Sequence, residues 1–147
     1  MSGPIVIGYR HTGIITNNME GSLKFYRDLL GLEVIQDFWD DSDYINTITG
    51  IKGANVHMKK LKAQDGTVVE LLEYVTHPTD IIQQPIYNVG ACHLAFHVNN
   101  VEDAYERIFR AGIHLISRPV VSSEGIAKVC FCIDPNNIRV ELVEMIG

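Results

Sequence analysis

Two stretches of the chain begin in the same way, and this internal repeat is the strongest constraint on the fold. Residues 8–35 begin Gly-Tyr-Arg-His and residues 90–117 begin Gly-Ala-Cys-His; a short apolar run and an Asn-Asn pair follow in both. The two histidines, His11 and His93, are 82 residues apart, and the Asn-Asn pairs keep the same spacing. A repeat of this length predicts two similar modules that pack around a pseudo-two-fold axis.

The hydrophobic pattern predicts the same order of elements in each half, βαβββ. In the first half we expect a helix over 19–30, a loop at 40–43, and strands over 5–16, 32–39, 54–63 and 67–75. In the second half we expect a helix over 101–112, an irregular stretch at 117–125, and strands over 92–98, 127–133 and 139–145. The sequence therefore predicts an α+β fold in one domain over 1–147, with module one at 1–79 and module two at 88–147.

Composition excludes several classes of partner. The apolar content of 46% indicates a globular protein, and a net charge of −6 without a basic cluster argues against nucleic acid as a partner. No apolar run approaches the roughly 20 residues needed to span a membrane, and the start lacks a secretory pattern. The three cysteines are an odd number without framework spacing, which indicates reduced thiols and a cytoplasmic protein.

Each half also contributes a histidine from its first strand and a glutamate from its last, where VELLE at 69–73 repeats as VELVE at 140–144. Two imidazoles and two carboxylates that converge would suit one divalent ion of the Zn, Ni, Co, Fe or Mn type. A dication would also offset the repulsion between two carboxylates in an apolar cleft. We therefore expect a metal site that both halves build.

Strand alternation indicates what lies beside each histidine. Gly13 and Ala95 follow His11 and His93 by two residues, and their small side chains leave room beside the imidazoles. The other strand face suits packing under a helix, so Cys92 is expected in the core. Three further predictions concern groups outside the site: core packing for Cys130 and Cys132, surface or structural roles for His57, His77 and His114, and a solvated strand for Lys59, Lys60 and Lys62.

The segments HTGIIT…SLKFYRDLLGLEV, VVELLEY, CHLAFHV and DPNNIRVELVE resemble the vicinal oxygen chelate superfamily, which contains glyoxalase I, epimerases, extradiol dioxygenases and antibiotic-resistance proteins. The resemblance covers almost the whole chain and implies paired βαβββ modules that form an open, cup-shaped barrel. It also implies a homodimer, and the exposed edges of an open sheet favour one too. The four ligand positions of the family fall on His11, Glu70, His93 and Glu141. The neighbouring Glu73 and Glu144 lie on the other strand face and do not match the motif.

The same resemblance implies a function. It is that of a divalent-metal-dependent isomerase, epimerase or lyase, glyoxalase I-like, which acts on a small carbonyl substrate through a metal-bound enediolate. Glu141 and Glu70 are then the candidate catalytic carboxylates, and a base outside the ligand set is the alternative. A ligand-sequestering resistance-type binding protein and a non-haem iron extradiol dioxygenase are alternative functions. Bacterial glyoxalases carry Arg and Asn four residues after the first two ligands, where this chain has Ile15 and Tyr74, which argues against glutathione as a co-substrate.

Overall fold

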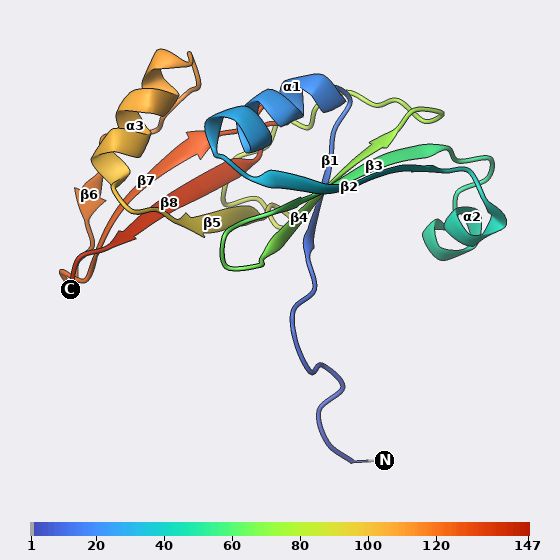
Figure 1. The fold of residues 1–147 in the computed structure, drawn as a ribbon, viewed down its shortest axis with the longest axis horizontal. Coiled ribbons are helices and arrows are strands. Elements are labelled where there is room, and N and C mark those ends of the chain that lie inside the picture. The colour runs from blue at the N-terminus through green and yellow to red at the C-terminus, as the bar shows by residue number, and fades with distance from the viewer. Residues whose placement is uncertain (1) are drawn as a thin grey trace. The chain divides into compact units, whose positions relative to one another are not determined.

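Each half of the repeat forms its own four-stranded sheet in the computed structural model, which describes residues 2–147 (Figure 1). The chain divides into two compact units: unit 1 ends at Thr79 and unit 2 begins at Asp80. The α+β class and the two βαβββ modules predicted from the sequence are confirmed. No helix among residues 2–147 is both long enough and apolar enough to cross a membrane.

In unit 1 the strand order is β1-β4-β3-β2, with β1 parallel to β4 and the other neighbours antiparallel. A helix of five residues, α1, continues directly into a π-helix, η1, between the first two strands. The bounds in chain order are β1 Thr12–Ile15, α1 Met19–Leu23, η1 Lys24–Leu29, β2 Glu33–Asp40, α2 Asp43–Thr49, β3 Val56–Lys62 and β4 Val68–Tyr74.

Unit 2 has the same topology, with the order β5-β8-β7-β6 and β5 parallel to β8. The irregular stretch expected at 117–125 contains a strand of two residues, β6, which completes the βαβββ order. The bounds are β5 His93–His97, α3 Val101–Arg110, β6 Val120–Val121, β7 Ala127–Ile133 and β8 Arg139–Met145.

One face of each sheet packs against the helix that follows the first strand of that unit. Alternation along the strands sends one set of apolar side chains to this face, and many of them are buried. In unit 1 the set comprises Ile14, Leu61, Val69 and Leu71, and the helical residues Leu23, Phe25 and Tyr26 are buried with it. In unit 2 it comprises Cys130, Cys132, Val140 and Leu142, with Val101 and Ile108 from α3. The prediction that Cys130 and Cys132 belong to the core is confirmed.

A repeated polar contact fixes where each of these helices begins. The Asn18 side chain accepts a hydrogen bond from the backbone of α1 at 2.9 Å, and Asn100 does the same for α3 at 3.0 Å. The carboxylates of Glu73 and Glu144 each accept the first backbone N–H of the same helices, both at 2.9 Å. A carboxylate at a helix N-terminus is favourable because the unpaired N–H groups there carry partial positive charge.

The opposite face of the unit 1 sheet carries α2, a helix that the sequence prediction lacks. Ile45 of α2 packs with Ala54, Val56 and Met58 in a buried cluster. The helix has seven residues, too few to show a clear helical period, and it follows the acidic run that predicted a loop. It ends at Gly50, whose φ of 72° is the left-handed conformation common at helix C-termini.

Two predictions at strand starts were wrong. The strand expected over 5–16 pairs only over Thr12–Ile15, because its partner β4 begins at Val68 and the register sets Thr12 opposite Val69. The preceding residues run away from the unit 1 sheet (Figure 1), and Ile7 is 97% exposed. Cys92 is exposed rather than buried, because β5 begins one residue after it and the alternation does not reach it.

Candidate metal centre

Unit 1 brings two of the predicted ligands together. His11 directly precedes β1, and Glu70 lies in the middle of β4, where it is the register partner of Gly13. The imidazole Nε2 of His11 is 3.7 Å from the carboxylate Oε1 of Glu70. Both side chains are largely covered, with 28% of His11 and 10% of Glu70 exposed.

Unit 2 repeats this arrangement with the other two predicted ligands. His93 is the first residue of β5, and Glu141 on β8 is the register partner of Ala95, two residues beyond the histidine. Here the imidazole Nε2 is 3.2 Å from the carboxylate Oε1. This pair is more open, with 44% of His93 and 23% of Glu141 exposed. The sequence repeat therefore produces the same histidine–carboxylate pair in each unit.

The two pairs have different neighbours. Lys60, which is opposite Glu70 on β3, places its Nζ 3.8 Å from Glu70 Oε2, and only 19% of its side chain is exposed. In unit 2 the residue opposite Glu141 is Phe131, whose ring meets the His93 ring edge-on at a centroid distance of 5.3 Å. One pair is thus flanked by a cation and the other by an aromatic ring.

The residues beside Glu70 on the same face of unit 1 are apolar. Leu72 and Tyr74 follow Glu70 at alternate positions of β4, and both pack on the buried cluster under α2. A Cβ atom at Gly13 would lie 3.3 Å from Leu72 Cδ1, so a larger residue there would require a small shift of the Leu72 side chain. Helix α2 thus covers an apolar region on the sheet face that carries the His11–Glu70 pair.

The donor atoms and their spacing suit a divalent ion. Two ligands that bond one ion at about 2.1 Å lie about 3.0 to 3.4 Å apart in octahedral or tetrahedral geometry. The observed separations of 3.2 and 3.7 Å between imidazole nitrogen and carboxylate oxygen are close to this range. Among residues 2–147, the structure brings no three His, Cys, Asp or Glu side chains together in an arrangement that could hold a metal ion. The four predicted ligands thus lie as two separate pairs, one in each unit.

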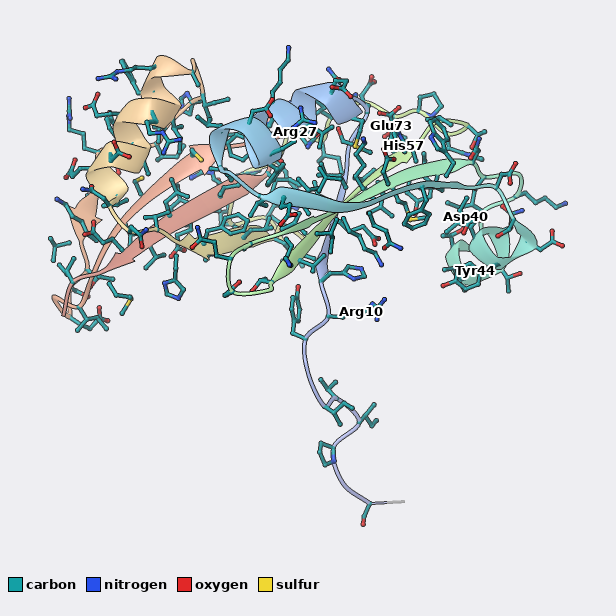
Figure 2. The ribbon with its side chains drawn as sticks, in the orientation of Figure 1. Arg10, Arg27, Asp40, Tyr44, His57 and Glu73 are labelled. Carbon is teal, nitrogen blue, oxygen red and sulfur yellow. The ribbon has the colours of Figure 1, made fainter. Side chains whose placement is uncertain are left out.

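The other candidate residues lie on the opposite sheet face from the histidine–carboxylate pairs. Glu73 and Glu144 point to the helix side, where they bind the helix N-termini. His57 is the cross-strand partner of Glu73, on the same side (Figure 2), and it stacks on Trp39 at 4.3 Å. Its Nε2 lies 2.7 Å from Asp37 Oδ1, which agrees with the structural role predicted for it.

Two of the three lysines expected on a solvated strand are largely covered instead. Lys59 donates a hydrogen bond of 2.8 Å to Asp37, and its side chain is 14% exposed. Hydrogen bonds from Lys59 and His57 lower the pKa of the Asp37 carboxyl. Lys60 pairs with Glu70, so it belongs to the surroundings of the candidate centre. Lys60 was missed because its role depends on the strand register, which places it opposite Glu70.

Comparisons with known proteins match almost the whole chain to one superfamily. The family model of the Glyoxalase/Bleomycin resistance protein/Dioxygenase superfamily matches residues 8–142. A lactoylglutathione lyase of Neisseria meningitidis is 24% identical over 135 residues, which cover 91% of this chain and 88% of that protein.

Solved structures share the fold. A glyoxalase family protein from Bacillus cereus superposes with a TM-score of 0.89 at 21% identity, covering 100% of this chain and 99% of that one. The fosfomycin resistance protein FosX from Listeria monocytogenes, solved with Mn(II) and a sulfate ion, gives a TM-score of 0.65 at 18% identity, covering 97% and 95%.

Proposed function

Because this chain belongs to the Glyoxalase/Bleomycin resistance protein/Dioxygenase superfamily, we propose that it is a divalent-metal-dependent isomerase, epimerase or lyase that acts on a small carbonyl compound. One observation carries this proposal: the same histidine–carboxylate pair, at ligand-like separation, occurs in both units. A single such pair could be an ordinary surface contact. Its recurrence at equivalent register positions favours a shared role.

We propose that His11, Glu70, His93 and Glu141 together hold one ion. The set supplies two neutral nitrogens and two carboxylates, whose combined charge of −2 balances a divalent cation. When bound, such an ion acts as a Lewis acid towards the substrate carbonyl and makes the neighbouring C–H more acidic. The remaining task for the protein is to move that proton.

Glu141 is the better candidate for the general base. Glu70 is 10% exposed and has Lys60 as well as His11 within ion-pair distance, so its carboxylate is held from two sides. Glu141 is 23% exposed, and its ion-pair partner among residues 2–147 is His93. A carboxylate with fewer fixed partners can turn towards a substrate carbon and accept a proton. Glu70 then stays in place as a ligand.

The test is solvent-deuterium exchange into carbonyl compounds, followed by NMR on protein reconstituted with a divalent metal. Glu141→Gln keeps one oxygen donor and removes the basic carboxylate, so we expect exchange to fall by about 100-fold or more. Glu70→Gln should reduce it less.

Glu144→Gln is the matched control for this experiment. It lies on the same strand but faces the helix, and its amide oxygen can still accept the helix N–H. We expect this variant to exchange at the rate of the parent. Undiminished exchange in the metal-loaded Glu141→Gln protein would refute the role of Glu141 as base.

The same experiment separates the other functions of the superfamily. A sequestering protein moves no proton, so none of the variants would alter a turnover. A dioxygenase would show bound iron and oxygen uptake on a catechol. Of the two positions that differ from bacterial glyoxalases, Ile15 is exposed and Tyr74 packs on the apolar cluster under α2, so neither supplies a charged or amide group for glutathione. This favours a substrate other than a glutathione adduct.

We also propose that the protein is a homodimer. The extended segment before β1 exposes Ile5, Ile7 and Tyr9 at 99%, 97% and 77%. Burial of an isoleucine side chain stabilises by about 1.5 to 3 kcal/mol, so a β-prone apolar segment of this kind favours association. Its backbone has no strand partner within unit 1, because β4 begins at Val68.

A further inference from the structure

The repeat between the two units breaks at the positions next to the histidine–carboxylate pairs. Two residues before the glutamate, unit 1 has Val68 and unit 2 has Arg139. An asymmetric substrate at a site built from repeated ligands must be recognised by residues that differ between the halves. Lys60 and Arg139 are charged residues at such positions, and Lys60 already pairs with Glu70, so the surroundings of Arg139 matter. The inference below rests on the proposed function.

The Arg139 guanidinium lies on the candidate face of unit 2, which is the sheet face that carries His93 and Glu141. Arg139 is the register partner of His93 in the parallel pair β5–β8, so both lie on the same side of the sheet. Its Cζ is 6.0 Å from the centroid of the Phe131 ring, and that ring contacts His93 edge-on. The guanidinium is thus held over an aromatic ring, beside a predicted metal ligand.

Arg139 has no carboxylate partner within ion-pair distance in the part of the chain that the structure describes, residues 2–147. The acidic side chain on its face, Glu141, pairs with His93 instead. Arg139 is also half-buried, so part of its hydration is lost. Its planar fork of N–H donors matches the two oxygens of a carboxylate or phosphate, and its charge is permanent. In unit 1, by contrast, the charge of Lys60 is already matched by Glu70.

We propose that Arg139 binds an anionic group of the substrate. The substrate is then a small carbonyl compound that carries a carboxylate or a phosphate within a few bonds of the reacting carbon. Arg139 orients this molecule on the face of the His93–Glu141 pair, and Phe131 holds the guanidinium in place. The residue acts in binding and specificity, and it takes no part in proton transfer.

The test measures binding to the full-length protein, with and without added divalent metal, by isothermal titration. The probes are pyruvate, which carries a carboxylate, inorganic phosphate, and hydroxyacetone, a neutral carbonyl compound of similar size. Arg139→Met removes the charge and keeps much of the apolar side chain. We expect it to weaken binding of pyruvate or phosphate by about tenfold or more, the scale of a charge-assisted double hydrogen bond, and to leave hydroxyacetone unchanged.

Two variants complete the design. Arg139→Lys keeps the charge without the fork, and it should retain part of the anion affinity. Arg118→Met is the matched control, because Arg118 also lies over an aromatic ring, that of Tyr105, away from the candidate face. We expect this control to bind all probes like the parent. Whichever anion depends more strongly on Arg139 identifies the group on the substrate.

Three results would overturn the inference. These are anion binding that is unchanged in Arg139→Met, an equal loss of hydroxyacetone binding, or a parent protein that binds neither anion. The outcome is separable from that of the proposed function. A protein that holds no metal but whose anion binding depends on Arg139 refutes the metal-dependent activity and supports this inference.

Discussion

The two carboxylates of the candidate centre have the same backbone register but different electrostatic surroundings. Glu70 is buried beside Lys60, whereas Glu141 is more exposed and lies beside Phe131. These neighbours come from the strand next to each glutamate, and they are not part of the repeat. This difference in local charge supports the proposal that Glu70 is a fixed ligand and that Glu141 moves the proton.

The three cysteines also have different surroundings, and their burial predicts which of them react. Burial raises the pKa of Cys132 to about 12 and also raises the pKa of Cys130, so at pH 8 both stay protonated and covered. Cys92 is exposed. Because the thiolate is the reactive form, we expect iodoacetamide at pH 8 to label Cys92 in the folded protein and all three thiols in urea.

Mass spectrometry of the labelled protein checks this prediction. Cys92→Ser should leave the folded protein unlabelled at pH 8. A label on Cys130 or Cys132 under native conditions would contradict the burial described here.

At the scale of elements, the helices that cover the sheets are anchored by side chains from the last strands. Glu73 and Glu144 each bind the first N–H of a helix more than 40 residues away along the chain. Each contact joins a helix to the strand that also carries a predicted ligand. Positions three residues apart on one strand thus place one glutamate on the helix face and one on the face of the predicted ligands.

The anchor in unit 2 can be tested by Glu144→Ala. This change leaves a partly buried helix N–H without its acceptor, and we expect the free energy of unfolding to fall by about 1 to 2 kcal/mol. Urea denaturation followed by circular dichroism measures the change, and metal binding should be unaffected. Glu124→Ala, at an exposed position in a turn, is the control and should have almost no effect.

Most elements could be predicted from the sequence, because their apolar residues follow a clear helical or strand period. The exceptions have physical causes. Helix α2 and strand β6 are too short to show a period, and β1 is cut short by the start of β4 at Val68. The neighbours of the centre, Lys60, Phe131 and Arg139, could not be identified from the sequence alone. They depend on the cross-strand register, which no local pattern determines.

At the scale of the whole molecule, the segment before β1 exposes apolar side chains that nothing within a single chain covers among residues 2–147. Ile5, Val6 and Ile7 are all exposed along it, and Arg10 lies where the segment approaches the sheet of unit 1 (Figure 2). An exposed apolar segment with an unpaired backbone invites pairing with another chain. Association of two copies would cover the segment.

Removal of residues 2–8 tests this explanation. We expect the full chain to be a dimer by light scattering at micromolar concentration, and the truncated chain to dissociate at the same concentration. Replacement of Ile5 and Ile7 by Ser, with the length kept, should have the same effect if apolar burial drives association. A full-length monomer would contradict the proposed dimer.

Metal content is the most direct test of the central claim that the repeated pairs form one divalent-metal site. We expect purified protein, reconstituted and passed through a desalting column, to hold about one divalent ion per chain by elemental analysis. His11→Ala combined with His93→Ala should retain almost none while the circular dichroism spectrum stays that of the parent, and His77→Ala, at an exposed position, should retain it all. Full occupancy in the double variant, or an empty parent protein after reconstitution, would contradict the claim.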